Sequence, residues 1–482
     1  MRDYILSGHA VHVSIVDRQL KSLGSNMVGK DNAAVISPSA GRLAGLSTMP
    51  TPVIRPLGTT VERAETRAYA AIIGGGLGGF AAAISLRRQG HRVTVYEKRD
   101  IAAEVGNSIS CAKNGGQWLH EWGVDIDSGY PIDLQKLVMR DYKTGAVDMI
   151  YDMSAYEQKW GFPYYMFHRQ DMLRMMITTA TQTAGQGPPS TLKILHSARS
   201  IDFDRGEIEF ENGLRVTADL IIGADGVVSK TRALMDLEPT IKLAASTCYR
   251  CNVRLDQLQE MGLERYADPA IQFWGGFETD DVNKYNKIVM APCNGGKLIS
   301  FYCFYPAKGF NVQDVSVEDL VSPFSQLDPD CLRMLNSSID RKPWRLYEHT
   351  PLTGWTQGRT GLLGDACHAM FPHQSQGACQ GIEDAAALGL IFSRRYNYTG
   401  NIEEGLKMYE SIRKPRADRV ALCSRLATED IRERIGFSSL PGSVSRGAPK
   451  PIPGHKRLTI EEINGYDMVA HLDELVPSHR KH

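Results

Sequence analysis

The chain has 482 residues, 42% hydrophobic and 23% charged, which is ordinary globular composition and enough for two or three structural units around a large core. Lys plus Arg and Asp plus Glu number 55 each, so no net charge favours binding to nucleic acid or to an anionic membrane. Nine cysteines without regular spacing disfavour a disulfide framework and fit a reducing compartment, for which we expect the cytoplasm.

The first 67 residues show no sustained periodicity, and residues 36–60 are rich in Ser, Gly, Pro and Thr. We interpret residues 1–67 as a flexible extension that precedes the fold. The opening 20 residues hold several charged side chains and no continuous apolar core, so a secretory signal peptide is not expected.

The fold is expected to begin at Tyr69. The sequence predicts a buried strand over 70–73, a glycine-rich turn, a helix over 77–89 and a second strand over 92–97. Residues 68–86 are uncharged and long enough to span a membrane, but the turn between strand and helix would leave backbone groups unsatisfied in lipid. No stable membrane span is therefore expected.

The glycine-rich turn reads Gly74-x-Gly76-x-x-Gly79, which is typical of dinucleotide binding. The first glycine permits a tight turn, the second lets the backbone approach a pyrophosphate, and the third allows the helix to pack closely on the strand. The positive end of the helix attracts phosphate. Glu97 ends the second strand, where its carboxylate would accept from the ribose hydroxyls and repel a 2′-phosphate.

Later segments alternate between strand and helix patterns. Strands are predicted over 193–196, 200–203, 207–210 and 220–223, with a turn at Asn212-Gly213. A further antiparallel sheet is predicted from 244–255, 270–275, 287–291 and 298–304. Helices are predicted over 377–394, 402–432 and 460–475, with a Pro-, Gly- and Ser-rich loop over 440–456.

Two more glycine motifs follow the predicted strands. Gly223-Ala224-Asp225-Gly226 follows a buried strand, and Gly364-Asp365 is followed by Pro372 and Gly377. With the first motif, they make the sequence resemble the group A flavoprotein monooxygenases, which include 4-hydroxybenzoate and salicylate hydroxylases, from residue 69 to about 430. Cys367 and Ser375 depart from the usual residues of this family, but both are small.

The resemblance implies an α/β fold, with a Rossmann-like FAD-binding domain, an inserted antiparallel-sheet substrate domain and C-terminal helices. The FAD-binding monooxygenase domain would span 68–430, and residues 396–482 would supply C-terminal helices and a loop. The cofactor-binding portions would be roughly 68–130, 190–240 and 350–395, and the substrate-binding portions roughly 131–189 and 241–349.

The resemblance also implies roles for individual residues. Asp225 would organise the loop near the pyrophosphate, Asp365 would bind the ribityl chain, and Arg169 would lie near the ribityl phosphate. The helix beginning near Gly377 would direct its positive end at the flavin N1/C2=O edge. The expected cofactor-binding residues are Gly74, Gly76, Gly79, Glu97, Lys98, Ser108, Arg169, Asp225, Gly226, Asp365, Pro372, Gly377 and Ala378.

The implied activity is NAD(P)H- and O2-dependent hydroxylation of a small phenolic or polyketide-like substrate through a flavin C4a-hydroperoxide. A phenol must be deprotonated or polarised before it reacts, so candidate catalytic residues are Arg250, His373 and Tyr249. Tyr249 and Arg250 would face opposite sides of a strand, and we favour Arg250 as the partner of a carboxylate or phenolate. No metal site is expected.

Other readings remain open at this point. A flavin-dependent epoxidase or decarboxylating hydroxylase would carry the same motifs, and a non-redox binding protein could share the fold. An NAD-linked dehydrogenase would not explain the second and third motifs. Small-molecule partners are therefore the aromatic substrate, NAD(P)H and O2, and the protein is expected to be a monomer or homodimer.

Overall fold

The protein was analysed as a computed structural model that describes residues 66–100, 106–275, 286–306, 315–429, 434–439 and 458–476. The extension predicted over 1–67, apart from Thr66 and Arg67, lies outside these ranges, as does the loop predicted over 440–456.

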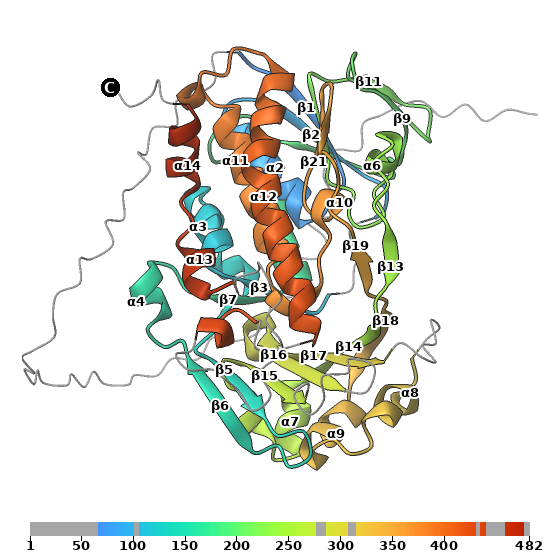
Figure 1. Ribbon diagram of the computed structural model, residues 1–482, viewed down its shortest axis with the longest axis vertical. Coiled ribbons are helices and arrows are strands. Elements are labelled where there is room, and N and C mark those ends of the chain that lie inside the picture. Colours follow the sequence, from blue (N-terminus) through green and yellow to red (C-terminus); the bar gives the residue numbers. More distant parts are fainter. Residues whose placement is uncertain are drawn as a thin grey trace, which may run out of the picture. The chain divides into compact units, whose positions relative to one another are not determined.

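A six-stranded sheet carries the glycine motifs, in the order β20-β21-β12-β1-β2-β8 (Figure 1). Its pairs are parallel except β20–β21. Because parallel strands end at one edge, the turns after β1, β12 and β21 come together there. The strands are β1 (Tyr69–Ile73), β2 (Arg92–Glu97), β8 (Thr191–Ile194), β12 (Leu220–Gly223), β20 (Thr356–Gln357) and β21 (Thr360–Leu362).

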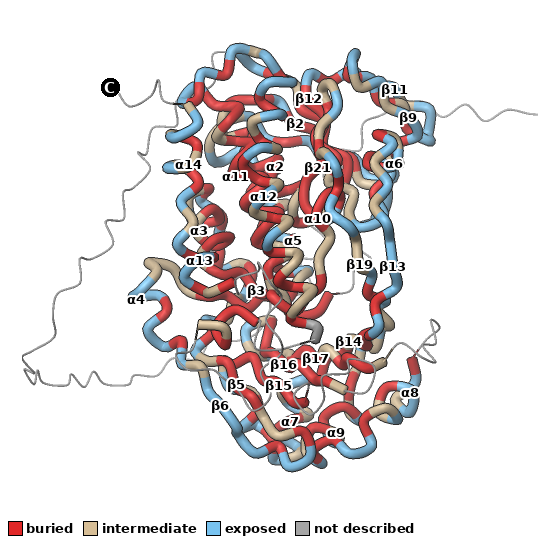
Figure 2. The backbone as a smooth tube through the Cα atoms, in the orientation of Figure 1, coloured by how far each residue is buried: buried red, intermediate tan, exposed pale blue. Residues whose placement is uncertain are grey.

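Helices α2 (Leu77–Arg88) and α11 (Gly377–Ile391) pack against each other beside this sheet, and α12 (Ile402–Glu429) lies along α11 (Figure 1). Both α2 and α11 are buried along most of their length, as Figure 2 shows in red. The approach of the two helices depends on Gly389, because a Cβ there would lie 2.0 Å from Oγ of Ser85. Helices α3 (Lys113–Glu121) and α5 (Arg169–Thr181) pack against α11 and α2 respectively.

A seven-stranded sheet, in the order β18-β14-β17-β16-β15-β5-β6, forms the second large layer. All of its neighbours are antiparallel except β15 and β5. One face packs on α7 (Leu255–Glu260), α8 (Val317–Val321) and α9 (Pro329–Asn336) in a separate apolar cluster. The strands are β5 (Lys136–Arg140), β6 (Val147–Asp152), β14 (Ser246–Arg254), β15 (Ala270–Gly275), β16 (Lys287–Cys293), β17 (Leu298–Pro306) and β18 (Ile339–Trp344).

Small sheets and short helices complete the described residues. The small sheets join β3 (Ser108–Cys111), β7 (Tyr165–His168) and β4 (Ile132–Asp133); β9 (Ala198–Asp202), β10 (Glu207–Phe210) and β11 (Arg215–Thr217); and β13 (Ile241–Leu243) with β19 (Tyr347–His349). The short α-helices are α4 (Tyr156–Trp160), α6 (Lys230–Leu234), α10 (Asp365–His368), α13 (Ile460–Asn464) and α14 (Met468–Leu475). Short 3-10 turns include Pro372–Gln374, called η6, and Phe437–Ser439.

The predicted α/β fold class, with its antiparallel insertion and C-terminal helices, is confirmed, but two local predictions were wrong. The strand predicted over 193–196 ends at Ile194, because Leu195 has a left-handed backbone with φ of 60°. The helix predicted over 460–475 is two helices, since Asp467 caps a second start by accepting from the Ala470 N–H at 2.9 Å.

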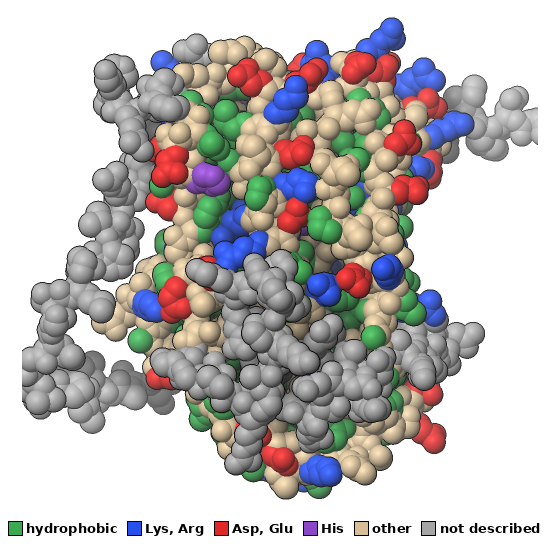
Figure 3. All heavy atoms as spheres, in the orientation of Figure 1, with side chains coloured by type: hydrophobic (Ala, Val, Ile, Leu, Met, Phe, Trp, Pro, Cys, Tyr) green, Lys and Arg blue, Asp and Glu red, His purple; other side chains and the backbone are tan. Residues whose placement is uncertain are grey.

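The described part of the chain shows no membrane span, and charge is mixed on the face that Figure 3 draws. No helix there combines the length and the apolar character needed to cross a bilayer. On the face drawn in Figure 3, basic and acidic side chains are interspersed, in keeping with the balanced composition. All nine cysteines are buried, and none of them forms a disulfide bond.

Gly79 provides a test of the strand–turn–helix packing. A Cβ at Gly79 would lie 2.0 Å from the carbonyl oxygen of Gly74, so Gly79→Ala should force the first turn of α2 away from the glycine-rich turn. We expect the free energy of unfolding to fall by about 1–3 kcal/mol, because overpacking costs that much, and the bound FAD content to fall with it.

Chemical denaturation and flavin absorbance would measure both effects. The matched control is Gly116→Ala, another helical glycine, whose Cβ would meet Tyr165 at an ordinary 3.7 Å. That variant should be as stable as the parent or slightly more so, because Ala favours helix. Equal stability of both variants would contradict the packing argument.

Candidate active site

Two adjoining cavities lie at the edge where the three glycine motifs meet. One has a volume of about 720 Å³ and the other about 360 Å³. They share five lining residues, which are Gly76, Arg169, Ala224, Gly226 and Asp365. The pair therefore forms one elongated space, which suits a ligand with two ends joined by a narrow middle.

The larger cavity is built on the first motif and the end of β2. Gly74 has φ of 114° and donates its N–H to the Tyr96 carbonyl at 2.8 Å, which fixes the turn. At Gly76 a Cβ would meet no atom within 4 Å, so the backbone is open to the cavity. The Glu97 carboxylate accepts from the N–H groups of Gly75 at 2.7 Å and Arg99 at 2.8 Å, and its free lone pairs line the cavity beside Lys98.

The second motif is a loop held by its own carboxylate. Asp225 Oδ2 accepts from the backbone N–H groups of Lys230 at 2.8 Å and Thr231 at 2.9 Å, and Oδ1 accepts from the Ser229 hydroxyl at 2.5 Å. These bonds place Gly226 at the junction of the two cavities. Asp225 thus orders the loop, which is the role that its motif implies.

The third motif brings Asp365 and the start of α11 to the same junction. Gly364 has φ of 65° and no atom within 4 Å of a Cβ position, so the chain turns there without closing the cavity. The Asp365 side chain lines both cavities and is accessible from them, and desolvation by the surrounding protein raises the pKa of its carboxyl group. Pro372, Gly377 and Ala378 line the smaller cavity where α11 begins.

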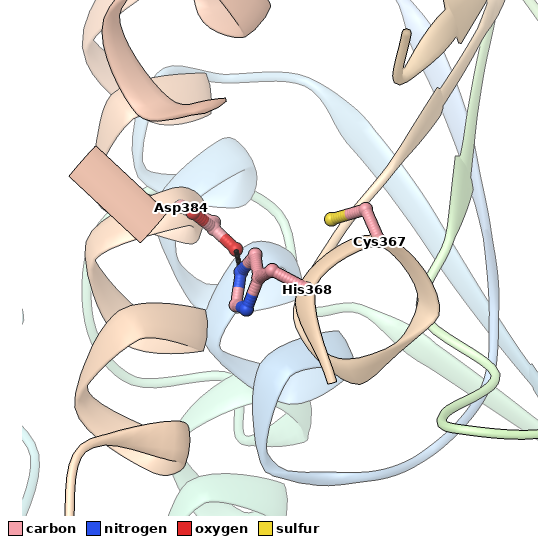
Figure 4. A group of neighbouring side chains, drawn as sticks. All are labelled: Cys367, His368 and Asp384. Carbon is pink, nitrogen blue, oxygen red and sulfur yellow. Dashed lines mark hydrogen bonds and ion pairs between the residues drawn. The ribbon is translucent and has the colours of Figure 1, made fainter. Parts of the chain in front are cut away.

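A buried carboxylate behind this loop fixes the position of Asp365 (Figure 4). Asp384 Oδ2 accepts from the Gly364 N–H at 3.0 Å and lies 2.6 Å from His368 Nε2, while Oδ1 accepts from Arg413 Nε at 2.8 Å. Burial favours the neutral acid, but His368 and Arg413 outweigh it and lower the Asp384 pKa. Burial opposes protonation of His368, but Asp384 outweighs it and raises the His368 pKa.

Cys367, His368 and Asp384 also have the donor types and closeness of a metal site, with donor atoms within 4.8 Å of one another. The interactions that these three residues already make indicate a different role. The Arg413 guanidinium supplies the positive charge that Asp384 needs, and burial raises the pKa of the Cys367 thiol far above its usual value. A second cation would meet Arg413 and a protonated thiol, so the three residues fit an ion-pair network better than a metal centre.

One face of the seven-stranded sheet forms the wall of the smaller cavity. The Arg250 side chain lines it, with its guanidinium 4.8 Å from the Trp344 ring and its Nε buried without a hydrogen-bond partner among the described residues. Tyr249 points to the other face and packs against Tyr305 in the second apolar cluster. Tyr249 lines neither cavity, and its inclusion as a catalytic candidate is corrected by this placement.

His373 lines the smaller cavity from η6, and two basic residues that the sequence analysis did not single out lie beside it. Lys287 Nζ lies 3.2 Å from His373 Nδ1, and Arg434 donates to the His373 carbonyl at 3.0 Å. Lys287 starts a strand that is otherwise apolar, and that break in the pattern was the available signal. Arg434 had no sequence signal, because only the tertiary fold brings it to the cavity.

The remaining residues that were predicted to bind the cofactor either line a cavity or pack against the backbone. Arg169 begins α5 and lines both cavities. Ser108 lines the smaller cavity at the start of β3, and its carbonyl accepts from the Tyr302 hydroxyl. Gly79 lines neither cavity, and its contact with Gly74 makes it a packing residue.

Comparison with known proteins agrees with this geometry. Residues 67–424 match the family described as FAD binding domain. FAD-dependent monooxygenase cfoG from Aspergillus candidus is 30% identical over 77% of this chain and 89% of its own. Hispidin-3-hydroxylase from Neonothopanus nambi is 31% identical over 73% of this chain and 86% of its own. The structure of Klebsiella pneumoniae HpxO with FAD and uric acid shares the fold, with a TM-score of 0.65, 22% identity, and coverage of 75% and 88%.

The residues present fit FAD. The open backbone at Gly76 suits a pyrophosphate, Glu97 has lone pairs free for ribose hydroxyls, and the start of the 15-residue helix α11 faces the smaller cavity. The Asp365 carboxylate lines both cavities, and a ribityl chain would supply hydroxyl donors to it.

Replacing Asp384 tests whether the ion-pair network supports this site. Asp384→Asn would leave the buried His368 without its counter-charge and Arg413 with Glu383 alone, and breaking a buried pair costs about 3–5 kcal/mol. We expect that fall in the free energy of unfolding, together with weaker FAD binding, measured by denaturation and by titration of flavin fluorescence.

Asp418→Asn is the matched control for this change. Asp418 lies on α12 and pairs with Lys414 at 2.7 Å in a partly exposed i,i+4 bridge, which is worth about 0.5 kcal/mol. If both variants bind FAD equally well, the network does not position the third motif.

Proposed function

This chain belongs to the FAD binding domain family and is an FAD-dependent monooxygenase, and from that premise we propose that it hydroxylates a small phenolic substrate with NAD(P)H and O2. The observation that carries the proposal is the continuity of the two cavities. The space between the three glycine motifs opens directly onto a wall of the seven-stranded sheet. A bound flavin and a substrate would therefore meet there.

Bound FAD would supply the redox chemistry, by accepting a hydride from NAD(P)H and activating O2 for transfer of one oxygen atom. The protein residues bind, orient and exclude water. Glu97 and Lys98 would hold the adenosine half, and Gly76, Gly226 and Arg169 the pyrophosphate. Asp365 would hold the ribityl chain, and the start of α11 would stabilise negative charge on the reduced ring.

The smaller cavity would bind the substrate between the flavin site and the sheet. Its wall is largely apolar, with Ile271, Val289, Ala291 and Phe304 among its lining residues. Such a surface suits an aromatic ring and keeps water away from the reacting atoms. Arg250 lies in the same wall, so it would bind a carboxylate or phenolate oxygen of the substrate.

The division into portions remains part of the proposal. FAD would bind to the portions 68–130, 190–240 and 350–395. The substrate would bind to the portions 131–189 and 241–349. Arg169 is an exception, because it lies within 131–189 but lines both cavities. Nine cysteines outside any disulfide bond are consistent with a cytoplasmic location, which we propose on that ground.

The function is tested by anaerobic mixing of the FAD-loaded protein with NADH or NADPH. Flavin absorbance should bleach, and bleaching should be faster with a phenolic compound present. A panel of phenols, with NAD(P)H oxidation and product mass as readouts, should yield a product heavier by one oxygen atom. A protein that never binds FAD, or whose flavin neither nucleotide reduces, would contradict the proposal.

Arg250→Ala tests the substrate wall. Because charge-assisted hydrogen bonds are worth about 1.5–3 kcal/mol, we expect substrate KM to rise by roughly tenfold to a hundredfold, or NAD(P)H oxidation to uncouple from hydroxylation. Arg254→Ala, at the exposed end of the same strand, is the matched control and should leave both unchanged. Unaltered kinetics in Arg250→Ala would remove this residue from the site.

A further inference from the structure

A buried lysine and histidine form a pair at the side of the substrate cavity. Lys287 shares one side of β16 with Val289 and Ala291, which line the cavity, because alternate residues of a strand face the same way. Its Nζ lies 3.2 Å from Nδ1 of His373. Lys287 is not among the lining residues, so it communicates with the cavity through the His373 imidazole.

The surroundings of Lys287 are unusual for a lysine. It is 3% exposed, and the Phe304 ring lies 4.8 Å from its Nζ. The charged or titratable groups that face it are His373, Arg434 and the Cys248 thiol, and no described residue forms an ion pair with it. Burial, reinforced by Arg434, lowers the pKa of Lys287 to about 7, so near neutral pH this amine both gains and loses a proton.

His373 has one nitrogen engaged by Lys287 and one without a partner. Its Nε2 is buried and makes no hydrogen bond with any described residue. Burial, together with Lys287 and Arg434, keeps the pKa of His373 well below its usual range, so the imidazole is neutral. The Phe304 and Phe371 rings lie beside it, and Arg434 holds its backbone carbonyl. A buried polar atom without a partner is costly unless a ligand supplies one.

We propose that Lys287 and His373 form a proton relay that ionises the hydroxyl group of the phenolic substrate, an inference that rests on the proposed function. The substrate O–H bond breaks as a bond forms between that proton and His373 Nε2. The Nδ1–H bond breaks as its proton passes to the lone pair of Lys287 Nζ. The products are a phenolate and an ammonium ion, while the imidazole stays neutral throughout.

The relay explains why both residues are needed. His373 alone is too weak a base in this setting to hold a proton, because burial and the nearby basic groups lower its pKa well below the usual range. Lys287 alone does not reach the cavity. A proton passed to Lys287 remains as a positive charge near the phenolate, which stabilises the ionised and more reactive form of the ring.

The test measures proton uptake when the FAD-loaded protein binds 4-nitrophenol in weakly buffered solution containing a pH indicator. At about pH 8 the probe is mostly phenolate and Lys287 is mostly unprotonated, given its pKa of about 7. Binding the phenolate should then draw about one proton per bound probe from the solution onto Lys287. The visible phenolate absorbance reports binding independently.

Two variants separate a relay from a simple positive charge. Lys287→Met should bind the probe more weakly and take up no proton. Lys287→Arg should retain binding, because its cation persists, but should also take up no proton, because arginine is protonated already. Lys297→Met, an exposed lysine beyond the far end of the same strand, is the matched control and should behave as the parent.

Folding of each variant is checked by its thermal midpoint and FAD content. Lys287→Met should be at least as stable as the parent, because it removes a buried ionisable group. No saturable probe binding by the parent, no proton uptake on binding, or equal uptake in Lys287→Met would each overturn the relay. Failure of NAD(P)H to reduce the flavin would instead contradict the proposed function. The measurement of proton uptake does not involve flavin reduction, so its result is independent of that outcome.

Discussion

The parallel pairing of β12 between β1 and β21 is the constraint on which the rest of the site depends. It places Ile73, Gly223 and Leu362 side by side in register, although more than a hundred residues separate each from the next along the chain. The turns after these strands meet at one edge because parallel strands share a direction. A single elongated space then follows from sheet topology, and the glycines keep the backbone from filling it.

The middle of α11 is held by charge rather than by apolar contact alone. Glu383 and Asp384 lie side by side on this helix, and Arg413 on α12 bonds to both carboxylates, at 2.5 and 2.8 Å. Arg416 adds a further bond to Glu383 at 2.7 Å. Buried ion pairs contribute little net stability, but they permit few alternative arrangements. This network therefore fixes where α12, α11 and the Gly364 turn lie relative to one another.

The sequence predicted this edge of the sheet well. Its glycines, Glu97 and Asp365 belong to short motifs whose spacing indicates the end of a strand and the turn that follows it. It predicted β10, β12 and β15 to the residue for the same reason, since short apolar runs were bounded by turns. The substrate wall was harder. Strands β5, β6 and β18 have mixed patterns, and Arg434 reaches the cavity only through tertiary packing. Lys287 illustrates the limit, because a lysine at a strand start normally indicates an exposed end.

The burial of every cysteine has a consequence for the durability of the protein. Oxidants such as hydrogen peroxide attack thiolates far faster than thiols. Burial raises the pKa of the Cys248, Cys293, Cys303, Cys331 and Cys367 thiols, and interaction with Cys379 together with burial raises that of Cys111. These six thiols therefore stay protonated near neutral pH and react slowly with such an oxidant.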